Sequence, residues 1–203
     1  MGKLAVFFAE GYEEIEALTV VDICRRCGLE VDMVAVPGAA QADGTADRHG
    51  ASQADGAAAL LVKGSHNVAV RMDKTIEQVN FDEYDMLVLP GGKLGTENLE
   101  AHEGLMAQVD AFYEGGRYVA AICAAPSILG HRGILKGRRA CCYPGFESQL
   151  EGADVTEGPV EVSGKVVTAR GMGASADFAL AIAAIFCGQD RADEMAETIC
   201  YRH

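Results

Sequence analysis

A cysteine between a buried strand and a helix is the residue of this sequence best placed for covalent chemistry. Cys123 directly follows the apolar run Tyr118–Ile122 and precedes residues 124–129, which are predicted to begin a helix. Unpaired N–H groups and the dipole at a helix N-terminus favour a thiolate, so the sequence predicts a pKa below the free value of about 8.5. The alternative is an inert core cysteine, and position alone favours neither. The turn follows the logic of a nucleophile elbow, although the Gly-x-Ser-x-Gly pattern is absent.

Two glycines follow another buried strand. Gly91 and Gly92 come just after the apolar run Met86–Leu89. Without side chains they let the backbone approach a ligand closely and present N–H groups, which is what an oxyanion hole requires. A plain turn fits the same two residues equally well.

Three carboxylates follow the first predicted strand. Glu13, Glu14 and Glu16 stand at the start of a predicted helix, where negative charge is favourable. If this helix end points at Cys123, the Glu16 carboxyl can donate or accept a proton beside the sulfur. Burial there would raise its pKa. A solvated helix start is the alternative.

These groups must be positioned by the ends of parallel strands. Apolar strands alternate with helical stretches, which predicts a parallel sheet covered on both faces and ligand binding beyond the carboxyl ends of its strands. The expected strands are residues 4–8, 31–36, 67–72, 86–89, 118–122, 139–142 and 165–168. The expected helices are residues 13–27, 105–113, 124–129, 175–186 and 191–199, with Gly28 ending the first and Ser175 capping the fourth.

Composition indicates one soluble domain. The chain has 203 residues, 49% of them hydrophobic, and we treat residues 1–203 as one domain with a flexible insertion at 38–59, which lacks large apolar side chains. The net charge of −13 disfavours nucleic acid and anionic membrane surfaces as partners. The apolar N-terminus is too short for a signal peptide or membrane span, so we expect a cytoplasmic protein with reduced thiols.

Five segments stand in a distinctive order along the chain. They are Glu10-Gly11-Tyr12-Glu13-Glu14-Ile15-Glu16, Val21-Asp22-Ile23-Cys24-Arg25-Arg26, Leu89-Pro90-Gly91-Gly92 with Leu94-Gly95 and Asn98-Leu99, Ala121-Ile122-Cys123-Ala124-Ala125-Pro126, and Thr168-Ala169-Arg170-Gly171-Met172-Gly173. Together they resemble the ThiJ/PfpI superfamily and, within it, the Parkinsonism-associated deglycase branch. The resemblance covers nearly the whole chain apart from residues 38–59.

This resemblance implies both an architecture and a site. It implies a flavodoxin-like α/β sandwich of three layers with a mostly parallel sheet, and a homodimer. It makes Cys123 the elbow nucleophile and Glu16 the carboxyl beside it, with backbone N–H groups from Gly92 and Ala124 and support from Gly91. It implies neither a cofactor nor a metal. The activities it implies are glutathione-independent glyoxalase, removal of early glyoxal adducts from proteins, chaperoning and oxidant sensing.

Several positions depart from the family pattern. Ala124 follows the nucleophile where family peptidases have His. Tyr143 stands where the deglycase branch often has His; its phenol, with an ordinary pKa near 10, can orient water but is a poor base at pH 7. Asp22, the usual acidic partner of that His, is expected to pair with Tyr143. Arg26 is expected to brace the dimer and Glu16. In place of the Ser-Arg pair expected near the dimer contact stand Ser65 and His66, and His66 is the only histidine expected near the site.

Three functions fit this site. In the first, Cys123 thiolate adds to a small reactive carbonyl, such as methylglyoxal or an early glycation adduct, and Glu16 moves the proton. In the second, oxidation of Cys123 to a sulfinate switches a sensor or a chaperone-like protein. The third, a cysteine peptidase or amidotransferase, requires a His beside the elbow and is disfavoured by Ala124.

The remaining cysteines are expected to play smaller parts. Cys24 and Cys27 have the spacing of a redox motif but lie inside a predicted helix, so redox or zinc function is disfavoured. Cys141 and Cys142 end a predicted strand, where one of them would approach the pocket as a secondary thiol. Cys187 and Cys200 are expected to serve packing or to lie on the surface.

Overall fold

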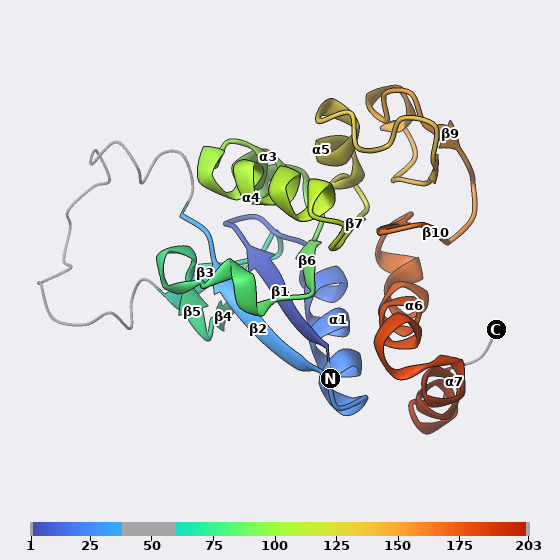
Figure 1. The fold of residues 1–203 in the computed structure, drawn as a ribbon. Coiled ribbons are helices and arrows are strands. Elements are labelled where there is room, and N and C mark those ends of the chain that lie inside the picture. The colour runs from blue at the N-terminus through green and yellow to red at the C-terminus, as the bar shows by residue number, and fades with distance from the viewer. Residues whose placement is uncertain (1, 38–59, 202–203) are drawn as a thin grey trace, which may run out of the picture.

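A seven-stranded sheet forms the centre of the protein, in a computed structural model that describes residues 2–37 and 60–201. The strand order is β10-β11-β7-β6-β1-β2-β5, and all neighbours are parallel except β10 and β11 (Figure 1). The strands are β1 (Lys3–Phe8), β2 (Glu30–Ala35), β5 (Lys74–Thr75), β6 (Met86–Leu89), β7 (Tyr118–Ile122), β10 (Val160–Ser163) and β11 (Val166–Ala169). The predicted flavodoxin-like sandwich is confirmed.

Helices cover both faces of this sheet. They are α1 (Glu14–Arg26), α3 (Lys93–Glu100), α4 (Glu103–Glu114), α5 (Pro126–His131), α6 (Ser175–Cys187) and α7 (Gln189–Thr198). In β1, Leu4, Val6 and Phe8 face the core under α1, α6 and α7, whereas Ala5 and Phe7 face the core under α3 to α5. Strands buried on both faces need continuous apolar runs, which is what the sequence has at β1, β6 and β7.

Two small sheets lie outside the central one. The strands β3 (Leu61–Lys63) and β4 (Ala69–Arg71) pair antiparallel, and β8 (Arg139–Ala140) pairs in parallel with β9 (Asp154–Val155). The strand predicted at residues 67–72 is therefore shorter and belongs to a separate hairpin. The predicted flexible insertion at 38–59 lies outside the described residues.

Of the two residues predicted to mark helix ends, one is confirmed and the other is not. Gly28 has a φ of 90° and directly follows the C-cap of α1, as predicted. Ser175 is not the N-cap expected of it. It is the first residue of α6, and its hydroxyl donates to the Met172 carbonyl at 2.8 Å instead of accepting from the helix.

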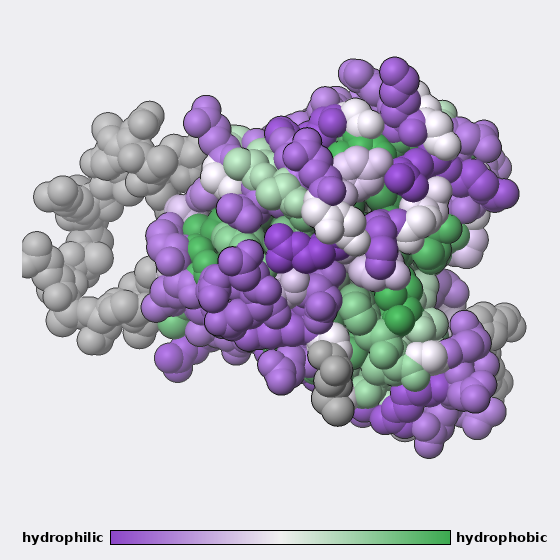
Figure 2. Space-filling model, in the orientation of Figure 1, coloured by the Kyte–Doolittle hydropathy of each residue, from purple (hydrophilic) through white to green (hydrophobic). Residues whose placement is uncertain are grey.

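The surface is mostly polar. Figure 2 shows hydrophilic residues over most of the visible face, with a band of hydrophobic residues over α6. Among the described helices, none combines the length and apolar character needed to cross a membrane.

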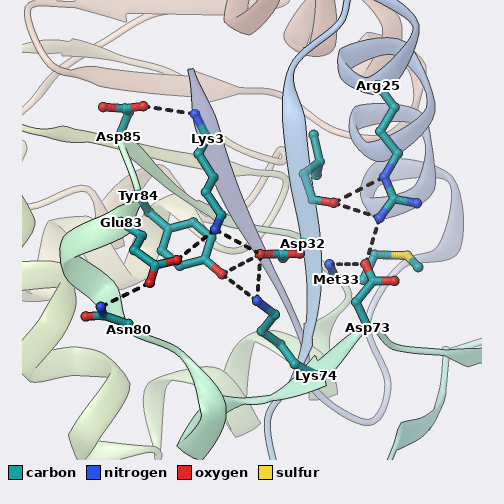
Figure 3. A network of polar contacts seen from close by, with 11 residues as sticks. Lys3, Arg25, Asp32, Met33, Asp73, Lys74, Asn80, Glu83, Tyr84 and Asp85 are labelled. Carbon is teal, nitrogen blue, oxygen red and sulfur yellow. Dashed lines mark hydrogen bonds and ion pairs between the residues drawn. The ribbon is translucent and has the colours of Figure 1, made fainter. Parts of the chain in front are cut away.

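A network of polar side chains joins β1, β2, β5 and the segment before β6 (Figure 3). The carboxylate of Asp32 accepts hydrogen bonds from the Tyr84 hydroxyl at 2.5 Å and from the Lys74 ammonium at 2.8 Å. The ammonium of Lys3 lies 4.8 Å from the centre of the Tyr84 ring and pairs with Glu83. These contacts hold the pKa of Asp32 below its ordinary value, although burial opposes them.

Substitution of Asp32 tests whether this network holds the short strand β5 to the sheet. We expect Asp32→Asn to lower the free energy of unfolding at pH 7 by about 1–3 kcal/mol, because a half-buried charged acceptor is lost. Since the folded-state pKa is lowered, this contribution is present at neutral pH and disappears as the pH falls through that pKa. Urea unfolding measures both effects. Asp22→Asn, which breaks an exposed pair, is the control and should cost less than about 1 kcal/mol; equal losses would contradict the assignment.

Candidate active site

Cys123 sits on a strained turn between β7 and α5. Its φ of 66° lies in the left-handed region that residues with a side chain rarely adopt. The strain is held by backbone hydrogen bonds at both ends: the Cys123 N–H donates to the Ala169 carbonyl at 2.9 Å, and its carbonyl accepts from Tyr143 N–H at 2.8 Å. The side chain is half-buried. This is the geometry of an elbow that presents one side chain at the carboxyl end of the sheet.

Glu16 faces this sulfur from the first turn of α1. Its side chain is 1% exposed, and its Oε2 accepts the Gly91 N–H at 3.0 Å. The carboxyl lies close enough to the Cys123 thiol for each group to shift the pKa of the other, and its Oε1 is buried without a hydrogen-bond partner among the described residues. The N-cap Glu13 fixes the turn by accepting the Glu16 N–H at 2.7 Å. The Glu16 carboxyl is therefore buried, with Oε2 bonded to the Gly91 N–H and Oε1 without a hydrogen-bond partner among the described residues.

Gly91 makes the approach of these two groups sterically feasible. A Cβ atom at position 91 would lie 2.4 Å from Glu16 Oε2 and 2.5 Å from Cys123 Cβ. At Gly92, which has a φ of 85°, a Cβ atom would lie 2.4 Å from the Gly11 carbonyl oxygen. Close packing therefore requires both glycines: Gly91 against Glu16 and Cys123, and Gly92 against the backbone before α1.

Backbone N–H groups also face the sulfur. Those of Gly92 and Ala124 favour the ionised form of Cys123 and lower its pKa against the effect of burial. An anion that develops next to the sulfur would meet these same donors. The two positions expected to supply an oxyanion hole therefore lie on either side of Cys123.

The pKa of the Cys123 thiol differs from the value that the sequence predicts. Burial, followed by the nearby negative charge of Glu16, raises the pKa of Cys123 to about 12, against the opposing N–H groups of Gly92 and Ala124. The predicted lowering is therefore wrong: α5 is a single short helix, and burial together with the carboxylate outweighs its dipole. Burial also raises the pKa of Glu16 to about 7, as expected, while the thiol and the Gly91 N–H lower it. At neutral pH the thiol is therefore protonated, and the adjacent carboxyl is close to the midpoint of its own titration.

A groove opens beside the pair. It has a volume of about 480 Å³ and is lined by Tyr143, Pro144, Glu157, Pro159, Arg170, Gly171, Met172, Gly173 and Ala174. A Cβ atom on Gly171 would lie 3.2 Å from the Tyr143 ring and 3.9 Å from Glu16 Oε1, so the groove comes close to this second oxygen of Glu16. Sequence reasoning used Gly171 only as part of a motif and did not identify this wall.

The residues expected to support the site lie differently from the prediction. Asp22 pairs with Arg26 one turn along α1 at 2.8 Å, and both side chains are largely exposed. The expected pairing of Asp22 with Tyr143 is therefore not formed, and neither does Arg26 brace Glu16. Tyr143 is 51% exposed and contributes its backbone N–H to the elbow.

His66 contacts Glu14 instead of Cys123. The buried Glu14 carboxylate accepts from the Ser65 hydroxyl at 3.1 Å and from the His66 N–H at 2.6 Å, and lies 3.0 Å from His66 Nδ1. Despite burial, these bonds lower the pKa of Glu14 to about 2. Glu13, Glu14 and His66 are the only three potential metal ligands within 4.8 Å of one another among the described residues, but the Glu14 oxygens are already occupied.

The neighbouring thiols of Cys141 and Cys142 do not join the site. Both residues are buried, and burial raises the pKa of both. The sulfur of Cys141 lies 3.4 Å from the Thr168 carbonyl oxygen. Neither cysteine is therefore the secondary thiol in the pocket that the sequence predicts.

A methyl group at position 91 tests the packing of the site. We expect Gly91→Ala to separate Glu16 from Cys123 and to slow alkylation of Cys123 or to change its pH dependence markedly, because the added carbon overlaps both side chains. Gly173→Ala is the matched control, since a Cβ there has no atom within 4 Å. Indistinguishable alkylation profiles of Cys123 in the two variants would contradict the packing described here.

The pH dependence of stability tests whether Glu16 is buried with a raised pKa. Its folded pKa of about 7 exceeds the ordinary value of 4.5, so its contribution to stability is complete below 4.5 and is lost as the pH rises through about 7. Between pH 5 and 8 the free energy of unfolding of the wild type should therefore fall by roughly 2–3 kcal/mol more than that of Glu16→Gln. Urea unfolding of both proteins at the two pH values measures this difference. Parallel pH dependence in the two would show that Glu16 is not perturbed.

Comparisons with known proteins agree with this fold. The model of the DJ-1/PfpI family matches residues 2–185. Protein dj-1beta of Drosophila melanogaster is 33% identical over 201 residues, covering 97% of this chain and 96% of that protein. A deglycase of Pyrococcus abyssi is 37% identical over 112 residues, covering 54% of this chain and 67% of the deglycase. The solved structure of oxidized Toxoplasma gondii DJ-1 is 31% identical, with a TM-score of 0.85 and full coverage of both chains. The chain therefore belongs to the DJ-1/PfpI family.

Proposed function

We propose that this protein is a cysteine-dependent enzyme that acts on small reactive carbonyls, with methylglyoxal and early glycation adducts of protein side chains as substrates. The observation that supports this best is the buried Glu16 carboxyl, with its pKa raised to about 7, next to the thiol of Cys123. A base held beside a nucleophile is the arrangement that covalent catalysis requires. The deglycase name of the Pyrococcus abyssi relative agrees with this substrate class.

The first step is attack by sulfur. The Glu16 carboxylate accepts the Cys123 proton as the sulfur forms a bond to the aldehyde carbon of methylglyoxal. The carbonyl oxygen takes the electron pair and is stabilised by the N–H groups of Gly92 and Ala124. Because this step consumes the negative charge of Glu16, it removes the charge that otherwise opposes a thiolate.

The later steps move protons and add water. Glu16, now protonated, gives its proton to the oxygen of the hemithioacetal. It then carries the proton from the former aldehyde carbon to the neighbouring carbon, while the hydroxyl proton of the hemithioacetal passes to the neighbouring oxygen, which yields the thioester of lactate. Water cleaves this thioester, releasing lactate and the Cys123 thiol. Tyr143 lines the neighbouring groove, and its phenol is suited to orient that water but not to ionise it at neutral pH.

The sensor function is the second candidate. A peroxide reacts with a thiolate, so the raised pKa of Cys123 favours the enzyme over spontaneous oxidation in the resting protein. The related DJ-1 of Toxoplasma gondii has been solved in an oxidized form, which supports oxidation of Cys123 as the alternative. A peptidase or amidotransferase has less support, because Ala124 follows the nucleophile and His66 is engaged by Glu14.

The proposal includes a cytoplasmic homodimer. Two exposed apolar residues support a dimer: Ile15 on α1 is 51% exposed, and Val68 in the β3–β4 turn is 48% exposed. The segments that carry them are linked through Glu14 and Ser65. An apolar surface on two linked elements is suited to a self-complementary contact.

Turnover of methylglyoxal tests the nucleophile. We expect Cys123→Ser to lose at least about a hundredfold in kcat/KM, because a serine hydroxyl is a far weaker nucleophile at neutral pH. Lactate formation by purified protein is the measurement. Cys200→Ser, which changes an exposed cysteine, is the control and should retain full activity. Full activity in Cys123→Ser would exclude this mechanism.

The pH profile tests the role of Glu16. Because the ionised carboxylate is the base, kcat/KM should rise with pH through about 7, the pKa of Glu16. Glu16→Gln should lose this rising limb together with about two orders of magnitude in rate. A wild-type profile that is flat between pH 5 and 8 would contradict the assignment of Glu16 as base.

A further inference from the structure

A second group of thiols lies at the other end of α1, away from the Cys123 elbow. Cys27 is the C-cap of α1, and Cys187 is the last residue of α6. The sulfur of Cys187 lies 3.7 Å from the carbonyl oxygen of Cys27. The fold thus brings together two cysteines that are 160 residues apart in the chain.

The geometry of this pair suits a covalent bond. A carbonyl oxygen lies about 2.4 Å from its own Cα, so the Cys187 sulfur is within about 6 Å of the Cα of Cys27. Disulfides join residues whose Cα atoms are about 4.4–6.8 Å apart, and the contact of the Cys187 sulfur with the Cys27 backbone brings the ends of α1 and α6 near this range. Both residues stand at helix ends, and Gly188, with a φ of 86°, follows Cys187.

The surroundings leave one thiol accessible and place a cation beside both. Cys27 is 8% exposed, whereas Cys187 is half-buried and open to a small oxidant. Because Cys187 is the more exposed of the two, it is the thiol expected to react first. The guanidinium of Arg191 lies near both sulfurs, donates to the Arg26 carbonyl at 3.0 Å and pairs with Glu194 at 2.6 Å, whose negative charge partly offsets it. A nearby cation stabilises a thiolate and so promotes its reaction with peroxides.

Cys24, the partner that sequence spacing suggests for Cys27, is poorly placed. It is fully buried in the core, and its sulfur lies 3.9 Å from the Ala179 carbonyl oxygen. Burial is the main cause that raises its pKa. The motif Cys24-x-x-Cys27 therefore does not define the reactive pair.

We propose that Cys27 and Cys187 form a second redox site, separate from Cys123, which a hydroperoxide converts into an intramolecular disulfide between the ends of α1 and α6. This site does not depend on the proposed enzyme activity. An intramolecular disulfide is a reversible oxidation product, which thiols reduce back to the two cysteines.

The chemistry balances with the hydroperoxide as oxidant. The Cys187 thiolate attacks one peroxide oxygen; the S–O bond forms, the O–O bond breaks, and the leaving hydroxide takes a proton to become water. Cys27 then attacks the sulfenic sulfur of Cys187, forming the S–S bond while the S–O bond breaks and a second water leaves. The two thiols lose two electrons and two protons in total, and the peroxide is reduced to water.

Peptide mapping of the peroxide-treated full-length protein tests the proposal. Trypsin cleaves after Arg26, which separates Cys24 from Cys27, and leaves Cys27 in residues 27–48 and Cys187 in residues 171–191. After stoichiometric hydrogen peroxide and alkylation without reductant, we expect these two peptides to be joined. The link should disappear on treatment with dithiothreitol. The intact protein should lose two hydrogen atoms and stay monomeric in covalent mass.

The experiment is done in the Cys123→Ser background, so that failure of the enzyme proposal and failure of this one are distinguishable. Cys24→Ala and Cys200→Ser should keep the link, whereas Cys27→Ser should abolish it and leave Cys187 to gain oxygen atoms. Arg191→Gln should slow formation of the link at least about threefold, because the cation is lost. Cys27 and Cys187 that both remain fully alkylatable, or a link between Cys24 and Cys27, would overturn the proposal.

Discussion

The site depends on one buried contact, the approach of the Glu16 carboxyl to the Cys123 sulfur. Two ionisable groups packed together away from water cannot both carry negative charge at moderate cost. Burial raises the pKa of each group, and the carboxylate raises that of the thiol further. The state in which both groups are ionised is therefore strongly disfavoured. A cysteine in this setting rests as a thiol at neutral pH.

The rest of the fold fixes the geometry of this contact. The parallel sheet places the ends of β1, β6 and β7 side by side, so that α1, the Gly91-Gly92 turn and the elbow meet at one edge. Hydrogen bonds from Tyr143 and to Ala169 hold Cys123 in its strained conformation. The lack of side chains at positions 91 and 92 provides the space, so glycine is required there for packing and not only for flexibility.

Much of this could be predicted from the sequence. The buried strands β6 and β7 have the predicted bounds because continuous apolar runs leave little ambiguity, and the order of motifs indicated the family. The acidity of Cys123 was mispredicted because a helix dipole can be read from sequence, whereas burial and the distance to a carboxylate cannot. The same limit applies to Asp22, whose partner is Arg26 on its own helix, and to Cys187, whose neighbour Cys27 is brought near only by the packing of α1 on α6.

A titration of Cys123 tests the central contact most directly. The rate of alkylation is followed against pH in the tryptic peptide of residues 118–132, which contains no other cysteine, for the wild type and for Glu16→Gln. If the carboxylate holds the proton on the thiol, the pKa of Cys123 falls in the variant even as catalysis is lost. An unchanged or higher pKa in Glu16→Gln would contradict the account.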